Sequence, residues 1–310
     1  MKYTYMEWHE SVLVQEVLGG LAVKEGDIIL DVTAGDGGHL SAFCDRYGDS
    51  VELIGTDADG QQIARAKERL SGVIADNKCR VTFVVNNFRD LDQSLKTVGH
   101  DSVDKILFDL GWSTPQIEQS GRGFSFRRDE PLKMMYASEM GDSGVTAETV
   151  VNSWDEKALR TIIRGYGEER FAGRIARCIT EARERKRIES TKELAQIIEE
   201  AVPVWYRHGR LHSATLTFQA IRMAVNDEIT VLEEGLRKSL EVLSPDGRVA
   251  VISFHSLEDR IVKRQFREWS KEKLGTIVTK KPVGPDDEER EANPRSRSAK
   301  LRIFQKNPAL

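Results

Sequence analysis

The sequence predicts an α/β protein with a mostly parallel sheet that is interrupted by a helical insertion. Short runs rich in β-branched residues alternate with segments of helical spacing, and this alternation stops after Phe108 and resumes after a long helix-rich stretch. Such alternation favours parallel strand pairing, with helices over both faces of the sheet. We therefore expect a discontinuous core over residues 1–116 and 214–310, and an inserted helical domain over residues 117–213.

The individual elements follow from the spacing of apolar residues. Those from Phe218 to Leu243 recur at steps of three and four, which predicts one long amphipathic helix that ends at residues 244–247. The last two strands are expected to pair as a hairpin across a polar loop, residues 282–298, which we expect to be mobile. The predicted strands are residues 28–32, 51–56, 81–85, 103–108, 249–254, 277–280 and 299–304.

Composition and cysteine usage describe a cytoplasmic protein that does not associate with membranes. Hydrophobic residues make up 39% of the chain, no apolar run has the length of a membrane span, and the first ten residues lack a signal-peptide pattern. Cys44, Cys79 and Cys178 are odd in number and far apart, so we interpret them as buried small side chains rather than a disulfide framework or a metal site.

The net charge of −4 conceals two basic stretches, which would suit an RNA partner as well as a salt-bridged surface. The first stretch lies in the insertion and the second lies near the C-terminus. They consist of Arg160, Arg164, Arg170, Arg174, Arg177, Arg183, Arg185, Lys186 and Arg187, and of Arg290, Arg295, Arg297, Lys300 and Arg302.

A glycine-rich turn follows the first predicted strand and precedes a helix, an arrangement that lets a ligand approach the backbone closely. Asp57 closes the next strand, where a carboxylate can accept hydrogen bonds from both ribose hydroxyls of a nucleoside cofactor. A dinucleotide needs a third small residue, but Leu40 stands there. S-adenosylmethionine has no phosphate, so it fits the turn better. The alternatives are a turn without a ligand, and Asp57 as a helix cap.

Three aspartates stand at the carboxyl ends of predicted strands, namely Asp31, Asp57 and Asp109. Ligands of open α/β sheets bind beyond these ends, so we expect the three carboxyl groups to converge on one cleft.

These motifs resemble the MraW family of ribosomal RNA small-subunit methyltransferases, and the similarity runs through nearly the whole chain. The matching segments are HESVL at 9–13, DVTAGDGGH at 31–39, DLGWSTPQ at 109–116, RGFSF at 122–126, YGEER at 166–170, FQAIR at 218–222, VNDE at 225–228, SFHSLEDRIVK at 253–263 and NPRSRS at 293–298.

The resemblance implies a class I (Rossmann-like) methyltransferase fold with a seven-stranded, mostly parallel sheet, whose insertion recognises the substrate. It implies S-adenosylmethionine-dependent methylation of N4 of a cytidine in the decoding centre of 16S rRNA, with the small ribosomal subunit as partner and no DNA. A homo-oligomer is left open. The resemblance also implies cofactor contacts from Gly37, Gly38, His39, Asp57, Phe88, Asp109 and Gln116.

The chemistry suggests roles for further residues. A cytosine N4 is a poor nucleophile, so an acceptor for its hydrogen would help, and Asp109 is our catalytic candidate. Trp112 is a second candidate, for stacking on the extruded base. For Trp112 the alternative is plain packing in the protein. For the expected substrate contacts the alternatives are a solvated loop, for the residues between 122 and 128, and a structural hydrogen bond, for His255. Those contacts are Arg122, Phe124, Arg127, Arg128 and His255. We expect no metal.

The chain departs from the family pattern at two places. Where the family usually reads PLDMRM, residues 131–136 read PLKMMY, and where it usually reads HPAT, residues 212–215 read HSAT. Lys133 and Met135 therefore replace two charges of opposite sign. The rival interpretations are an RNA-binding assembly factor without turnover, and a methyltransferase that acts on a protein or a small molecule.

Overall fold

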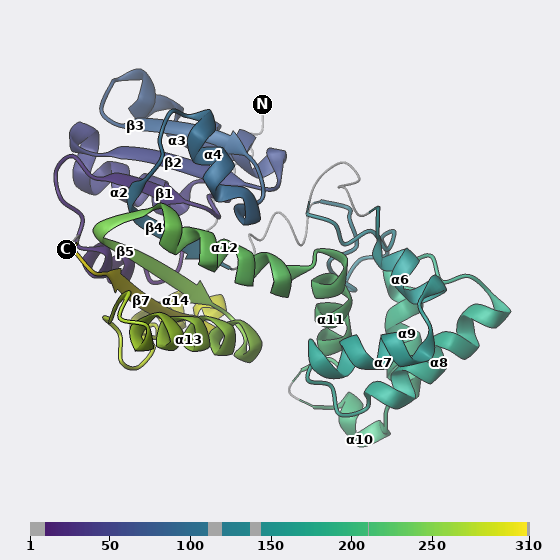
Figure 1. Ribbon diagram of the computed structural model, residues 1–310. Coiled ribbons are helices and arrows are strands. Elements are labelled where there is room, and N and C mark those ends of the chain that lie inside the picture. Colours follow the sequence, from purple (N-terminus) through teal and green to yellow (C-terminus); the bar gives the residue numbers. More distant parts are fainter. Residues whose placement is uncertain (1–9, 111–119, 137–143, 210, 309–310) are drawn as a thin grey trace, which may run out of the picture. The chain divides into compact units, whose positions relative to one another are not determined.

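The computed structural model describes residues 10–110, 120–136, 144–209 and 211–308 (Figure 1). The chain divides into two compact units. Unit 1 comprises Met1–Ser113 and Thr230–Leu310, and unit 2 comprises Thr114–Ile229. Within the described residues, no helix has both the length and the apolar character that crossing a membrane requires.

Unit 1 is built on a seven-stranded sheet in the order β3-β2-β1-β4-β5-β7-β6. The first five strands in this order pair in parallel, whereas β7 runs antiparallel to both β5 and β6. The sheet therefore has the mostly parallel character that the sequence predicts. The strands are β1 (Ile28–Asp31), β2 (Glu52–Asp57), β3 (Arg80–Val85), β4 (Val103–Asp109), β5 (Leu243–Ser253), β6 (Gly275–Ile277) and β7 (Lys300–Lys306).

Helices flank this sheet because its central strands are apolar on both faces. In β4, five of the seven residues are buried, and they include consecutive residues that point to opposite faces. The helices of unit 1 are α1 (Val14–Leu21), α2 (Gly38–Tyr47), α3 (Gly60–Ala75), α4 (Leu91–Thr97), α12 (Glu228–Val242), which begins at the boundary with unit 2, α13 (Ser256–Lys271) and α14 (Asp287–Ala292), with 3-10 turns η1 (Gly48–Ser50), η2 (Phe88–Asp90) and η3 (Pro294–Ser298).

The structure differs from the expectations at the polar loop and at the cysteines. The loop predicted to be mobile contains α14 and η3, and Glu289 anchors it by accepting a hydrogen bond from the Leu13 N–H at 2.8 Å. Cys44 and Cys79 are buried as expected, but the expectation of no disulfide was wrong, because the fold brings α2 and the residue before β3 together and the two cysteines form a disulfide across 35 residues of sequence. Cys178 is half-buried rather than buried.

Unit 2 is a helical unit with its own apolar core, to which Leu159, Ile175 and Leu194 belong. The alternation of apolar residues at helical spacing forms this core, and capping residues such as Ser190 start its helices. The helices are α6 (Ala147–Ser153), α7 (Glu156–Gly165), α8 (Ala172–Arg185), α9 (Thr191–Ala201), α10 (Val204–Arg207) and α11 (Thr215–Val225).

The long helix predicted from residue 218 onward is in fact two helices, α11 and α12. The chain breaks between them at Asn226 and Asp227, where Asp227 has a left-handed backbone with a φ of 50°. Phe218 and Ile221 of α11 pack in the unit 2 core, so unit 1 resumes at Thr230 rather than at residue 214. Apolar spacing alone did not reveal the break, because the helical period continues across it.

Candidate functional site

The three strand-end aspartates lie close together in unit 1. Strands β2, β1 and β4 are neighbours in the sheet, and they end at Asp57, Asp31 and Asp109. The carboxyl groups of Asp57 and Asp109 are near enough to raise the pKa of Asp31 further, beyond the larger effect of its burial. The expected convergence at one edge of the sheet is therefore present.

The glycine-rich turn follows β1 in the chain. Two of its glycines have a positive φ, a backbone conformation that other residues rarely adopt. Gly35 has a φ of +54° and Gly37 a φ of +85°, and helix α2 begins at Gly38. Asp36 between them is buried and lies 3.2 Å from the Arg69 guanidinium of α3. Asp36 was not among the predicted site residues, although a charged residue between two glycines was a visible signal.

Asp57 holds this turn in place through its two carboxylate oxygens. Oδ2 accepts a hydrogen bond from the Gly35 N–H at 3.0 Å, and Oδ1 accepts one from the Asp59 N–H at 2.8 Å. A carboxylate has about four lone-pair sites, which is more than these two hydrogen bonds use. The same group can therefore both fix the glycine turn and receive ribose hydroxyls.

Asp109 is held from two sides at the end of β4. Its N–H donates to Thr33 Oγ1 at 2.6 Å, and its Oδ2 lies 3.3 Å from Nε2 of the buried His39. Its Oδ1 is buried and accepts no hydrogen bond from any described residue. An unsatisfied buried oxygen of this kind costs free energy unless a ligand satisfies it, which points to a ligand contact at Asp109.

Asp31 and His39 are both completely buried, and their pKa values shift. Burial raises the pKa of Asp31 to about 7, against the opposing effects of His39 and of a hydrogen bond from the Thr33 N–H. For His39, burial disfavours the charged form, but the neighbouring Asp109 and Asp31 outweigh it and raise the pKa. The edge of the sheet thus holds a carboxyl group that is partly protonated near neutral pH.

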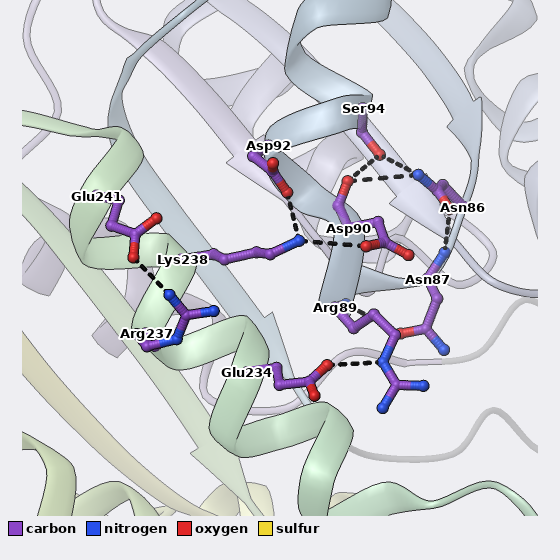
Figure 2. Close-up of polar contacts among 10 residues, drawn as sticks. All are labelled: Asn86, Asn87, Arg89, Asp90, Asp92, Ser94, Glu234, Arg237, Lys238 and Glu241. Atoms are coloured by element: carbon purple, nitrogen blue, oxygen red, sulfur yellow. Dashed lines mark hydrogen bonds and ion pairs between the residues drawn. The ribbon is translucent and has the colours of Figure 1, made fainter.

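Phe88, the residue expected beside the adenine, begins η2 and is half-buried. Its ring packs edge-on against Phe108 at a centroid distance of 5.6 Å. Helix α12 holds η2 by ion pairs, because Arg89 lies 2.8 Å from Glu234 and Lys238 lies 3.2 Å from Asp90 (Figure 2). Lys238 also reaches Asp92 of α4 at 2.7 Å.

Gly235 of α12 allows the close approach of Phe88, which sequence analysis did not foresee. A Cβ at position 235 would lie 2.7 Å from Phe88 Cδ2 and 3.2 Å from the Phe88 carbonyl oxygen, which is too close for either to remain in place. A glycine inside an amphipathic helix pattern was the available signal.

We expect Gly235→Ala to displace Phe88 and to weaken S-adenosylmethionine binding by about tenfold or more, which corresponds to about 1.4 kcal/mol. Overpacking of this kind also costs about 1–3 kcal/mol of stability. Calorimetric titration measures the affinity. Gly72→Ala in α3 is the matched control, because nothing lies within 4 Å of its added Cβ. Equal affinities of the two variants would contradict the role of Phe88.

The expected substrate contacts of the loop in unit 2 differ in accessibility. Arg122 is buried, and its Nη1 donates to the carbonyl oxygens of Met135 at 3.3 Å and Tyr136 at 2.5 Å. Phe124 is half-buried and stacks on Tyr136 at 5.9 Å. These contacts favour a structural role for both residues.

The remaining expected contacts divide between exposed and structural positions. Arg127 and Arg128 are exposed, so an RNA phosphate can reach them. His255 caps α13, where its Nε2 lies 2.9 Å from Glu258 Oε1, and the Glu258 carboxylate in turn accepts from the His255 N–H. These contacts favour a structural hydrogen bond, rather than a substrate contact, as the role of His255. Trp112 and Gln116 lie outside the described residues.

The two basic stretches are partly engaged within the protein. Arg183 donates to the carbonyl oxygens of Val151 and Trp154, and Lys186 pairs with Glu193. In the second stretch, Arg302 is buried against Asp259, whereas Arg290 pairs with Asp287. Other members are exposed, among them Arg160, Arg170, Arg174, Arg177, Arg295 and Arg297.

Comparison with known proteins identifies the family. The model of the MraW methylase family matches residues 6–307. The chain belongs to the MraW methylase family. It is similar to proteins named ribosomal RNA small subunit methyltransferase H, with 45% identity in Sulfurihydrogenibium sp. (95% of this chain, 98% of the relative), 40% in Brevibacillus brevis (96% and 98%) and 42% in Clostridium botulinum (96% and 98%).

Membership of the MraW methylase family makes S-adenosylmethionine the cofactor and the sheet of unit 1 that of a class I methyltransferase, as the sequence predicted. The residues present fit this cofactor, because the unsatisfied Asp109 Oδ1 and the glycine turn lie at the same edge of the sheet. We expect Gly37, Gly38, His39, Asp57, Phe88 and Asp109 to hold it, and these assignments stay predictions.

Proposed function

We propose that this protein methylates N4 of a cytidine in the decoding centre of 16S rRNA, as part of small-subunit assembly in the cytoplasm. The observation that carries the proposal is the identity of 40–45% over 95–96% of the chain to proteins named ribosomal RNA small subunit methyltransferase H. The geometry of unit 1 supports it, because Asp109 Oδ1 offers a buried acceptor at the edge of the sheet.

In this reaction, the bound cofactor supplies an electrophilic methyl group on sulfur. N4 would attack this methyl group through its lone pair, sulfur would keep the electron pair of the broken C–S bond, and the Asp109 carboxylate would accept the N4 proton. Asp109 would orient N4 and raise the electron density on its nitrogen by accepting a hydrogen bond from the N4–H group. Thr33 holds the backbone of Asp109 and His39 lies against its carboxylate, so that this group does not have to reorient during transfer.

The second unit is proposed to recognise the rRNA. Its exposed arginines, among them Arg127 and Arg128, offer phosphate contacts that position the strand without reading its sequence.

Mass spectrometry of nucleosides and of oligonucleotide fragments from small-subunit rRNA, isolated with and without this protein, tests the proposal. We expect N4-methylated cytidine at one decoding-centre position only in the presence of the protein. The same methylation level in both samples, or methylation of another nucleotide, would remove the proposed specificity.

The departures at Lys133 and Met135 are expected to leave the protein active. Lys133 is exposed, and the uncharged Met135 is half-buried against the unit 2 core. The two departures therefore leave no unpaired charge buried at these positions. Losing both members of a charged pair costs far less than losing one. We expect the Lys133→Asp, Met135→Arg double variant to transfer labelled methyl groups to under-methylated small subunits at a rate within about tenfold of the parent, or about 1.4 kcal/mol in barrier.

The parent protein and the double variant are compared at equal cofactor saturation. If the parent binds cofactor without transfer and the double variant restores transfer, then the family charges are required. A non-catalytic assembly role would then replace the enzymatic one.

A further inference from the structure

Unit 2 carries a large aromatic side chain on its surface. Trp205 of α10 is 61% exposed, and its neighbour Val204 is 64% exposed, whereas Tyr206 is half-buried. Tryptophan is highly buried on average, because its indole has a large apolar surface. An indole left in solvent is therefore a feature that a partner would explain.

An arginine lies against this indole. The guanidinium carbon of Arg170 is 5.1 Å from the Trp205 ring centroid and 4.9 Å from that of Phe171. The Phe171 and Trp205 rings meet edge to face at 6.0 Å. These cation–π and aromatic contacts restrict the indole, so that less conformational freedom is lost when a ligand binds.

Buried contacts anchor the cluster from the interior. The Tyr206 hydroxyl donates to Oε2 of the fully buried Glu169 at 2.8 Å, and Oε1 of Glu169 accepts from the Phe171 N–H at 2.7 Å. Burial and this contact raise the pKa of Tyr206 to about 12, so its hydroxyl remains a donor. We call the four residues Arg170, Phe171, Trp205 and Tyr206 the aromatic platform.

The charges around the aromatic platform favour a polyanion. Exposed Arg164 donates to the Arg170 carbonyl oxygen at 3.4 Å, and exposed Arg207 donates to that of Val202 at 3.3 Å. Arg174 is exposed on the first turn of α8. Apart from the buried Glu169, the carboxylates on the same segments are those of Glu168, Glu200 and Glu199, the last of which pairs with His212 at 2.8 Å, and they are fewer than the four arginines at 164, 170, 174 and 207.

We propose that the aromatic platform binds unpaired RNA, with one base stacked on Trp205 and adjacent phosphates on the arginines. Stacked aromatics combined with cations are the usual means of binding single strands. The inference rests on the proposed function, because it takes RNA as the substrate. It adds a recognition surface that is separate from the loop at residues 122–128, and it names the unpaired strand as what this surface binds.

The test measures binding of a labelled single-stranded RNA and of a matched RNA duplex to the full-length protein by fluorescence anisotropy. We expect Trp205→Ala to weaken single-strand binding by roughly 5- to 150-fold, the range for loss of one stacked base, with little change for the duplex. Trp205→Phe should retain most of the affinity because it keeps an aromatic face. Arg170→Gln should weaken binding and reduce its salt dependence, by about 0.7 in the log–log slope if it contacts one phosphate.

Val204→Ala is the matched control, because Val204 is an equally exposed apolar residue on the same helix. Equal losses in Trp205→Ala and Val204→Ala would overturn stacking, and so would unchanged single-strand affinity in Trp205→Ala. Weaker binding to intact small subunits with unchanged affinity for both RNAs would also overturn it, and would assign the platform to a ribosomal protein. Melting temperatures verify that each variant folds. If Trp205→Ala does not fold, then Trp205→Phe and Arg170→Gln still decide the test.

Methyl transfer to small subunits separates this inference from the proposed function. If the parent transfers methyl groups while Trp205→Ala keeps the same affinity for single-stranded RNA and the same KM for small subunits, the role of the platform alone is overturned. An absence of transfer by the parent, together with the expected loss of single-strand affinity in Trp205→Ala, would overturn the proposed function alone.

Discussion

Asp109→Ala is expected to lower the rate of methyl transfer by about 10²- to 10⁴-fold, the range for loss of a positioned general acid–base group. Thr33 holds the Asp109 backbone and His39 lies against the carboxylate, whose Oδ1 accepts no hydrogen bond from a described residue. Alanine removes this acceptor while the backbone N–H can still donate to Thr33. The measurement is a single-turnover rate at saturating cofactor, so that weaker cofactor binding does not enter it.

Asp104→Ala provides the matched control for this prediction. Asp104 lies on the same strand β4, near its other end, where its Oδ2 accepts a hydrogen bond from the Ile28 N–H at 2.9 Å. Its loss should cost about 1 kcal/mol of stability and leave the transfer rate nearly unchanged. A near-normal rate for Asp109→Ala, or an equal loss in both variants, would remove Asp109 from the chemistry.

The contribution of Asp31 to the stability of the protein is expected to fall between about pH 4 and 7. An unfolded aspartate has a pKa near 3.8, and burial raises that of folded Asp31 to about 7. In this window the folded state therefore binds a proton that the unfolded state has lost. The stabilisation is complete below the unfolded pKa and is lost as the pH rises through the folded pKa. The slope is about 1.4 kcal/mol per pH unit, or roughly 4 kcal/mol over the window.

Asp31→Asn should remove this dependence, because an amide does not titrate and its oxygen can still accept from the Thr33 N–H. Urea unfolding of parent and variant, followed by circular dichroism at several pH values, measures the difference. The exposed Asp101→Asn serves as control, and its curve should parallel that of the parent. Parallel curves for the parent and Asp31→Asn would show that Asp31 is not protonated in the folded state.

Much of the fold and of the candidate site was predictable from local sequence. The strands, the glycine turn and the strand-end aspartates depend on residue periodicity and on the conformational freedom of glycine, which act over a few residues. Because the carboxyl ends of parallel strands share one edge of a sheet, Asp31, Asp57 and Asp109 could be expected together before any coordinates were known.

Other features depended on contacts between distant segments, which the sequence does not encode locally. The break at Asp227, the Cys44–Cys79 disulfide and the close approach of Gly235 to Phe88 each require knowledge of which surfaces meet. Arg122 looked like a phosphate ligand because arginine in a loop is usually solvated, yet its guanidinium is buried against two carbonyl oxygens.

The sequence by itself determined the methylase family, the cofactor class and the edge of the sheet where we expect the cofactor to bind, because these depend on motifs whose residues are adjacent or at fixed spacing. Only the tertiary structure decided which charged groups are engaged and which are available. Burial makes Asp31 a proton acceptor near neutral pH and leaves Asp109 Oδ1 without a partner among the described residues, while Trp205 remains exposed. Solvent exposure and electrostatic environment are properties of the packed chain, and no local pattern specifies them.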